Sequence, residues 1–187
     1  MSLPRRSLGA DVEPELVVLL DTRGRPIGTA RKDRVHAAET PYHLAFSCYV
    51  FGPDDHLLLS RRALGKRTFP GVWTNSCCGH PGPGEQTSDA VRRRLSYELG
   101  LVPTRLDLAL PDFSYRASAD GIEENELCPV FLARVGTEPQ PQPAEVDDVA
   151  WVAWADFAAR SQEADFSPWA RLQVPLLGDA VARFLGA

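Results

Sequence analysis

The sequence predicts an α/β sandwich folded as one domain, and three observations support this prediction. The chain has 187 residues, a length that suits a single domain. Short apolar runs bounded by glycine, proline and aspartate are typical of β-strands. Two longer segments lie between residues that begin and end helices. Because these strands and helices are mixed along the chain, we expect them to pack as layers of one α/β domain.

The strand predictions rest on apolar runs and on the turns between them. We expect strands at residues 16–20, 43–51, 57–59, 122–134 and 149–154. A turn at residues 23–26 follows the first strand, and Gly52-Pro53-Asp54-Asp55 turns the second strand into the third as a hairpin. Asp120-Gly121 is the strongest hairpin signal in the chain, because this dipeptide favours a tight two-residue turn.

Capping residues indicate two helices. Either Thr87 or Ser88 can cap the first helix, which we expect to end at Gly100, a typical C-terminal stop. Ser167-Pro168 is typical of a cap followed by the first helical residue, and it opens a C-terminal helix. We expect Pro175 to kink that helix, because proline lacks the backbone donor that a helix interior needs.

Three segments are expected to lie outside the regular structure. Residues 1–14 carry prolines and arginines without periodicity, and we expect a mobile leader there, which leaves residues 15–187 as the single domain. Residues 63–84 are rich in glycine and proline and should be mostly loop. Residues 136–148 contain three prolines and should be a linker.

Composition excludes several classes of partner. The net charge of −5 argues against a nucleic-acid partner. No apolar stretch approaches the roughly 18 residues that would cross a membrane. The four cysteines form no C-x-x-C pair, so we expect neither a zinc knuckle nor a disulfide framework, and we place the protein in the cytoplasm. We expect a monomer, with a homodimer as the alternative.

Two glutamates at strand spacing indicate a metal site. Glu124 and Glu126 lie two residues apart in a predicted strand, so both side chains project from the same face. Two carboxylates on one face repel each other unless a cation lies between them. The imidazoles of His36, His43 and His80 can complete a mixed shell for Zn²⁺, Mn²⁺ or Mg²⁺. Each histidine taken singly also fits a hydrogen-bonded core or surface residue.

A second motif begins at Gly79 and reads GHPGPGEQTSDAVRRRLSYELGL. It resembles the Nudix signature, G-x5-E-x7-R-E-U-x-E-E-x-G-U, in which U is a bulky apolar residue. Two positions depart from that signature, because Arg94 and Tyr97 stand where it has glutamate. Glu98 can still bind Mg²⁺, and Arg94, one helical turn away, can bind a phosphate oxygen. We therefore expect a site that holds a diphosphate and is poorly equipped to hydrolyse it.

Five further stretches resemble the type 1 isopentenyl diphosphate isomerases: HLAFSCYVF, RRALGKRTFPGVWTNSCCGHP, RRRLSYELG, GIEENELCPVF and FSPW. The resemblance runs in order from about residue 15 to residue 170, and TNSxCGHP with a downstream ExE is its most specific part. It implies a Nudix-type α/β/α sandwich with a mixed sheet. It also implies isomerisation of isopentenyl diphosphate to dimethylallyl diphosphate.

The resemblance also implies roles for individual residues. The metal ligands would be His36, His43, His80, Glu124 and Glu126. A Mg²⁺ ion that bridges the diphosphate would be held by Glu98. The diphosphate itself would be bound by Lys32, Arg62, Lys66 and Arg94, and Trp169 would line the substrate pocket. The catalytic groups would be Cys78, Glu126 and Tyr115, with Cys77 a bystander.

The chemistry of an unactivated alkene suits these residue types. Protonation at C4 gives a tertiary cation at C3, and loss of a proton from C2 gives the allylic isomer. We expect Glu126 with Tyr115 to deliver the proton and Cys78, as thiolate, to remove one; nearby cations would help to ionise this thiol. The indole face of Trp169 would stabilise the cation, whereas Trp151 and Trp154 fit core packing better.

Two other functions fit part of the sequence. A Nudix hydrolase of a nucleoside diphosphate derivative explains the helix at residues 87–100 but gives no role to Cys78, Glu124 or Glu126. A non-catalytic metal- or phosphate-binding module predicts that Cys78 can be replaced without loss of function. Of the three functions, only the isomerase gives Cys78 a role.

Overall fold

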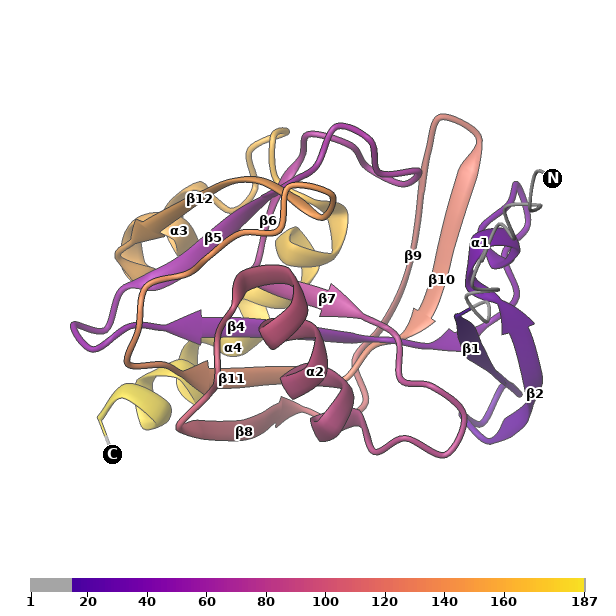
Figure 1. Ribbon diagram of the computed structural model, residues 1–187, viewed down its shortest axis with the longest axis horizontal. Helices are drawn as coiled ribbons and strands as arrows, with labels where there is room; N and C mark the ends of the chain where they lie inside the picture. Colours follow the sequence, from indigo (N-terminus) through magenta and orange to yellow (C-terminus); the bar gives the residue numbers. More distant parts are fainter. Residues whose placement is uncertain (1–14, 187) are drawn as a thin grey trace, which may run out of the picture.

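Two β-sheets and four helices make up residues 15–186, the part of the chain that this computed structural model describes (Figure 1). The predicted leader at residues 1–14 lies outside the described residues. The first sheet has the strand order β2-β1-β3-β10-β9. Its strands are β1 Leu16–Leu20, β2 Pro26–Arg31, β3 His43–Leu44, β9 Ser114–Ala119 and β10 Ile122–Leu127.

The second sheet has the strand order β12-β5-β4-β11-β8, with two short strands added along its length. Its main strands are β4 Phe46–Phe51, β5 Leu57–Arg62, β8 Arg105–Leu110, β11 Val130–Arg134 and β12 Val146–Val152. The short strands are β6 Trp73–Thr74, which pairs with β5, and β7 Cys77–Gly79, which pairs with β4. β11 runs parallel to β4 while its other neighbour, β8, is antiparallel, so the sheet is mixed.

Helices cover both faces of the second sheet. They are α2 Thr87–Leu99 on one face and α3 Trp154–Arg160 and α4 Pro168–Leu185 on the other. The short helix α1 Lys32–Val35 packs instead against β1 and β2 of the first sheet. In Figure 1, α2 lies in front of the second sheet and α4 lies behind it. Strand alternation explains the two layers, because Cys48 and Val50 of β4 pack on the α2 side while Tyr49 and Phe51 pack with α3 and α4. The predicted α/β/α sandwich with mixed strands in one domain is confirmed.

Two extended chain runs pass from one sheet to the other. The predicted strand at residues 43–51 is divided at Ala45 into β3 and β4, and the one at 122–134 is divided at Cys128-Pro129 into β10 and β11. The two runs stay parallel neighbours across the change of sheet, since the amide of Ala45 donates to Leu127 and that of Ser47 to Pro129. Pro129 has no amide to donate, which interrupts the ladder at this point.

The helix ends follow the sequence signals in part. Gly100 ends α2 in the left-handed conformation, at φ 63°, as predicted. The prediction that Thr87 or Ser88 caps α2 is wrong, because Gln86 is the capping residue and no side chain accepts from the first turn. Ser167 does cap α4, through its hydroxyl oxygen and the amide of Ala170, and α4 continues past Pro175.

Several elements carry no strong signal. β2, α1, β8 and α3 were not predicted, and the expected loop at residues 63–84 contains β6 and β7. The last strand occupies residues 146–152 instead of 149–154, so it begins inside the expected linker. β2 has five exposed residues out of six, which removes the apolar alternation that identifies a strand.

None of the helices in the described part of the chain combines the length and apolar character that crossing a membrane requires.

Candidate active site

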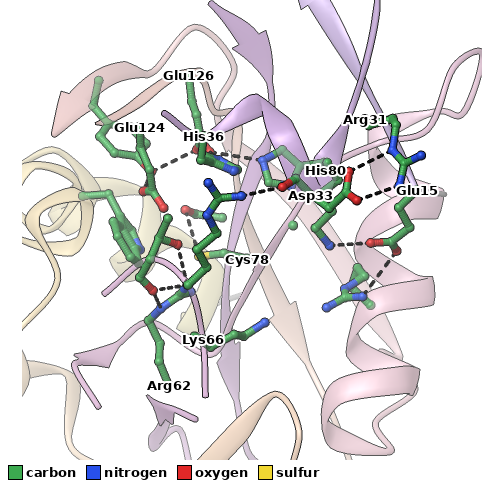
Figure 2. Close-up of a pocket in the computed structure, with 18 residues that line it drawn as sticks. Glu15, Arg31, Asp33, His36, Arg62, Lys66, Cys78, His80, Glu124 and Glu126 are labelled. Carbon is green, nitrogen blue, oxygen red and sulfur yellow. Dashed lines mark hydrogen bonds and ion pairs between the residues drawn. The ribbon is translucent and has the colours of Figure 1, made fainter. Parts of the chain in front are cut away.

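A cavity of about 660 Å³ opens between the two sheets and gathers most of the predicted site residues (Figure 2). Eleven of them line it: Lys32, His36, Arg62, Lys66, Cys78, His80, Arg94, Tyr115, Glu124, Glu126 and Trp169. His43 and Glu98 do not line the cavity but contact residues that do. Every residue predicted for the site therefore lies in or directly behind one cavity.

Three neighbouring strands of the first sheet place one row of functional side chains. Glu126 of β10 pairs with His43 of β3 on one side and with Tyr115 of β9 on the other. Glu124 lies two residues before Glu126 on the same strand, and both carboxylates are buried. The prediction that these two glutamates share a face is confirmed, and Asn125 between them bonds away from the cavity, to the carbonyl of Thr40.

Four side chains converge as a possible metal site. His36, His43, His80 and Glu126 each offer one ligand atom, and these atoms all lie within 4.8 Å of one another. Oε1 of Glu126 is 3.2 Å from Nε2 of His80 and 3.4 Å from Nε2 of His43. The same oxygen is 3.9 Å from Nε2 of His36. The side chains come from the end of α1, from β3, from the residue after β7 and from β10.

The donor atoms of this cluster fit a divalent cation. Nε2 of His36 is buried and has no hydrogen-bond partner among the described residues, which is costly unless a cation occupies the site. Nδ1 of His43 donates to the carbonyl of Pro41 at 2.9 Å, so the lone pair of its Nε2 faces the cluster. Imidazole and carboxylate ligands accept Zn²⁺, Mn²⁺ or Mg²⁺, so the geometry supports a metal without selecting one.

Glu124 lies outside this set of four and bonds to Tyr115 instead. The Tyr115 hydroxyl donates to Oε2 of Glu124 at 2.7 Å and lies 2.9 Å from Oε2 of Glu126. Burial, together with the charge of Glu126, raises the pKa of Glu124. Burial acts the same way on Glu126, but the surrounding imidazoles outweigh it and hold the pKa of Glu126 well below its usual range. The three side chains thus form one hydrogen-bonded, proton-holding group.

Cys78 faces the same cavity from the second sheet. Its sulfur donates to Oδ1 of Asn75 at 3.2 Å and lies 3.5 Å from the hydroxyl of Ser47. Burial raises the pKa of Cys78 to about 12, although Ser47, Asn75 and Arg62 oppose that rise. This environment therefore favours the neutral thiol, and the thiolate stays a prediction. Cys77 packs on the opposite side of β7, in the core beneath α2.

Trp169 is held rigidly although it lines the cavity. Its indole N–H donates to Oδ1 of Asn75 at 2.9 Å, and its ring meets the edge of Phe69 at 5.3 Å. The guanidinium of Arg62 lies 5.5 Å from the centre of the indole ring. Arg62 also donates to the carbonyls of Thr68 and Phe69, so it fixes the loop that borders the cavity. Asn75 and Phe69 had no predicted role.

Each remaining predicted phosphate-binding cation is paired with a carboxylate. Lys32 lies 2.6 Å from Glu15, Lys66 bonds to Glu145, and Arg94 lies 2.5 Å from Glu98. Burial raises the pKa of Glu98, and the charge of Arg94 opposes that rise. Sequence reasoning missed Glu15 and Glu145, because no local motif surrounds either residue. Tyr97, at the other departure from the signature, is 52% exposed and does not line the cavity.

Comparison with known proteins agrees with this geometry. Residues 41–174 match the NUDIX domain. The chain is 56% identical over 168 residues to the isopentenyl-diphosphate Delta-isomerase of Mycolicibacterium vanbaalenii, covering 89% of this chain and 93% of that protein. It is 54% identical over 173 residues to the protein of the same name from Frankia alni, covering 91% of this chain and 89% of that protein.

Solved structures show the same fold at low sequence identity. DR0079 from Deinococcus radiodurans superposes with a TM-score of 0.64 at 18% identity, over 87% of this chain and 99% of that chain. A MutT protein from Methanosarcina mazei Go1 superposes with a TM-score of 0.60 at 21% identity, over 80% of this chain and 99% of that chain. The identity to the two isomerases confirms the resemblance that the sequence motifs indicate. The chain belongs to the NUDIX domain family and, within it, to the isopentenyl-diphosphate Delta-isomerases.

Proposed function

We propose that this protein converts isopentenyl diphosphate to dimethylallyl diphosphate by adding a proton to the alkene and removing one from the neighbouring carbon. One observation carries the proposal: two proton-bearing groups reach the same cavity from different sheets. Cys78 comes from β7 of the second sheet, and Tyr115 with Glu126 comes from the first. A substrate between them would meet a proton donor and a proton acceptor at once, as an acid–base isomerisation needs.

The cations of the cavity would bind the diphosphate. Lys32, Lys66 and Arg94 carry side chains that suit phosphate oxygens, and all three line the cavity. Both bonds from Arg94 to Glu98 end on Oε1, which leaves Oε2 of this carboxylate available for Mg²⁺ among the described residues. Mg²⁺ is commonly held by one or two carboxylates together with substrate phosphates, so Glu98 fits that role.

The proton transfers balance within the named groups. The pair formed by Tyr115 and Glu126 gives a proton to C4, and the electrons of the double bond form the new C–H bond. The cation at C3 is then quenched when Cys78, as the predicted thiolate, takes a proton from C2 and becomes the thiol, and the C2–H electrons form the new double bond. In the reverse direction Cys78 is the donor and the Tyr115–Glu126 pair is the acceptor.

Two further features support the intermediate. The rigid indole of Trp169 offers a face that stabilises a cation without attacking it. A divalent metal bound by His36, His43, His80 and Glu126 would supply positive charge that fixes the Glu126 carboxylate and tunes its acidity. Glu124 lies beside this cluster, and its role as a fifth ligand stays a prediction.

A hydrolase reading is less well supported by the same geometry. Nudix hydrolysis needs several carboxylates on the helix, whereas on α2 the carboxylate directly behind the cavity is Glu98, and it is paired with Arg94. A single domain over residues 15–187, a cytoplasmic location and a monomeric state complete the proposal as predictions.

The test is proton NMR of isopentenyl diphosphate in D₂O with metal-loaded protein and Mg²⁺. We expect dimethylallyl diphosphate that carries deuterium. Cys78→Ala should abolish this conversion, and Cys77→Ala should keep it, because the Cys77 side chain points into the core beneath α2. No conversion by the unmodified protein, with phosphate released instead, would replace the proposal with a hydrolase.

A further inference from the structure

The cations assigned to the diphosphate are already paired in this structure. Lys32 bonds to Glu15, Lys66 bonds to Glu145, and Arg94 contacts Glu98 at 2.5 Å and Glu145 at 3.1 Å. Three positive side chains therefore share this end of the cavity with three carboxylates. These carboxylates offset the charge of the three cations, so a diphosphate would meet a less positive pocket than the cations alone would form.

Glu145 occupies the central place in this network. Oε1 lies 3.1 Å from Nη2 of Arg94, and Oε2 bonds to Nζ of Lys66, so one carboxylate holds two of the three cations. Its side chain is only 15% exposed. Burial alone would raise the pKa of Glu145, but Lys66 and Arg94 outweigh it and keep that pKa below its usual range. Glu145 is therefore an anion beside the diphosphate cations.

The backbone fixes this carboxylate in position. Glu145 directly precedes β12, and its carbonyl accepts from the amide of Ala63 at 3.0 Å, which anchors it to the chain that leads to Lys66. Oε1 of Glu98 approaches the same Nη2 atom of Arg94 that Glu145 does. The two carboxylates thus converge on a single guanidinium nitrogen, one from α2 and one from the start of β12.

We propose that Glu145 is the counter-ion that makes diphosphate binding depend on Mg²⁺. The inference rests on the proposed function, because it takes Lys66 and Arg94 to be diphosphate ligands. A diphosphate that arrives alone must displace Glu145 from both cations and leave a partly buried carboxylate unpaired beside new negative charge. Glu98 and Glu145 would hold a Mg²⁺ ion that binds with the diphosphate, and Arg94 and Lys66 would then be free to bind the phosphate oxygens.

Removal of the Glu145 charge should therefore weaken the coupling between the two ligands. Coupling between two binding events is typically about 5- to 150-fold, and it is reciprocal. In the unmodified protein we expect Mg²⁺ to tighten pyrophosphate binding within that range. In Glu145→Gln we expect Mg²⁺-free binding to become tighter, so that the coupling factor falls by about 5-fold or more.

The experiment is calorimetric titration of inorganic pyrophosphate into protein loaded at the His/Glu cluster, in buffers with and without Mg²⁺. Glu163→Gln is the matched control, because it removes the same charge and an ion pair with Arg160 at an exposed site away from the cavity. Glu145→Asp keeps the charge and should keep most of the coupling. This second variant separates a role for the charge from a purely structural role.

Three results would overturn the inference. Equal coupling in Glu145→Gln and Glu163→Gln would mean that the charge of Glu145 is not part of the linkage. Weaker Mg²⁺-free binding in Glu145→Gln would mean that Glu145 only positions Lys66 and Arg94. No pyrophosphate binding by the unmodified protein, with or without Mg²⁺, would also remove the proposed diphosphate site, whereas the first two results leave that site intact.

Discussion

Asn75 joins two residues that the proposed chemistry uses separately. Its Oδ1 accepts from the Trp169 indole at 2.9 Å and from the Cys78 thiol at 3.2 Å. Its Nδ2 donates to the carbonyls of Cys48 and Cys77, which fixes the orientation of the amide. A fully buried amide with every partner satisfied holds its neighbours in place. Asn75 therefore sets how the cation-stabilising ring and the thiol face each other.

Replacement of Trp169 should slow the chemical step more than it weakens binding. Trp169→Phe loses the bond to Asn75 and part of the cation–π stabilisation, which is worth about 0.5–2 kcal/mol. We expect kcat to fall about 2- to 30-fold with a smaller change in KM. Steady-state kinetics of isopentenyl diphosphate isomerisation measure both values.

Trp154→Phe is the matched control for this variant. Trp154 packs against Tyr49 in the core, with ring centres 6.2 Å apart, and it does not line the cavity. We expect its kcat to stay close to that of the unmodified protein. An unchanged kcat in Trp169→Phe would argue that the indole face takes no part in stabilising the cation.

At the scale of single elements, two glycines in helical segments should respond in opposite ways to alanine. Gly100→Ala forces a side chain into the left-handed conformation and brings its Cβ to 3.1 Å from Gln140, so we expect a loss of about 1–2 kcal/mol of stability. Gly178 lies inside α4 with open space around it, and Gly178→Ala should add about 0.5–1 kcal/mol. Urea unfolding measures both changes, and a neutral Gly100→Ala would contradict the cap.

Elements with a local signal could be predicted, and those that depend on distant partners could not. Gly100 and Ser167-Pro168 mark helix ends through residues within one turn, so both boundaries were found. The division of β10 from β11 at Pro129 depends on which sheet each half joins, and no local pattern shows that. The cap of α2 was assigned to the wrong residue, because Thr87 and Ser88 are of the types that favour this position, whereas Gln86 occupies it without a capping side-chain bond.

The site residues likewise separate into those that a local sequence pattern predicts and those that it does not. Glu124 and Glu126 were predicted from a two-residue spacing, and the residues from Gly79 to Leu101 from one continuous motif. Glu145 lies in the expected linker, and its partner Lys66 is 79 residues away in the sequence. Only the pairing of β12 with β5 brings the two together.

At the scale of the whole molecule, metal binding should contribute to stability. A ligand that binds only the folded state adds about 2.7 kcal/mol when present at 100 times its Kd. Removal of the metal by a chelator should therefore lower Tm by about 5–10 °C for a domain of this size. Differential scanning calorimetry measures the change, and excess Zn²⁺ or Mn²⁺ should restore the original value.

Histidine variants separate this effect from a general action of the chelator. His36→Ala removes the unpaired Nε2 from the cluster and should make Tm insensitive to the chelator. His56 lies in the β4–β5 turn, outside the cluster, and His56→Ala should respond as the unmodified protein does. An equal chelator response in both variants would place the stabilising metal elsewhere.

The parallel pairing of β3 with β10 has a consequence for folding fidelity. Glu126 reaches His43 and Tyr115 only when the β9–β10 hairpin and the distant strand β3 align in one register. A slip of a single residue along β10 would turn Glu123 and Asn125 toward the cavity and direct Glu124 and Glu126 away from it. Recovery of metal binding after refolding would therefore report native strand alignment, and chains trapped out of register would be compact but inactive.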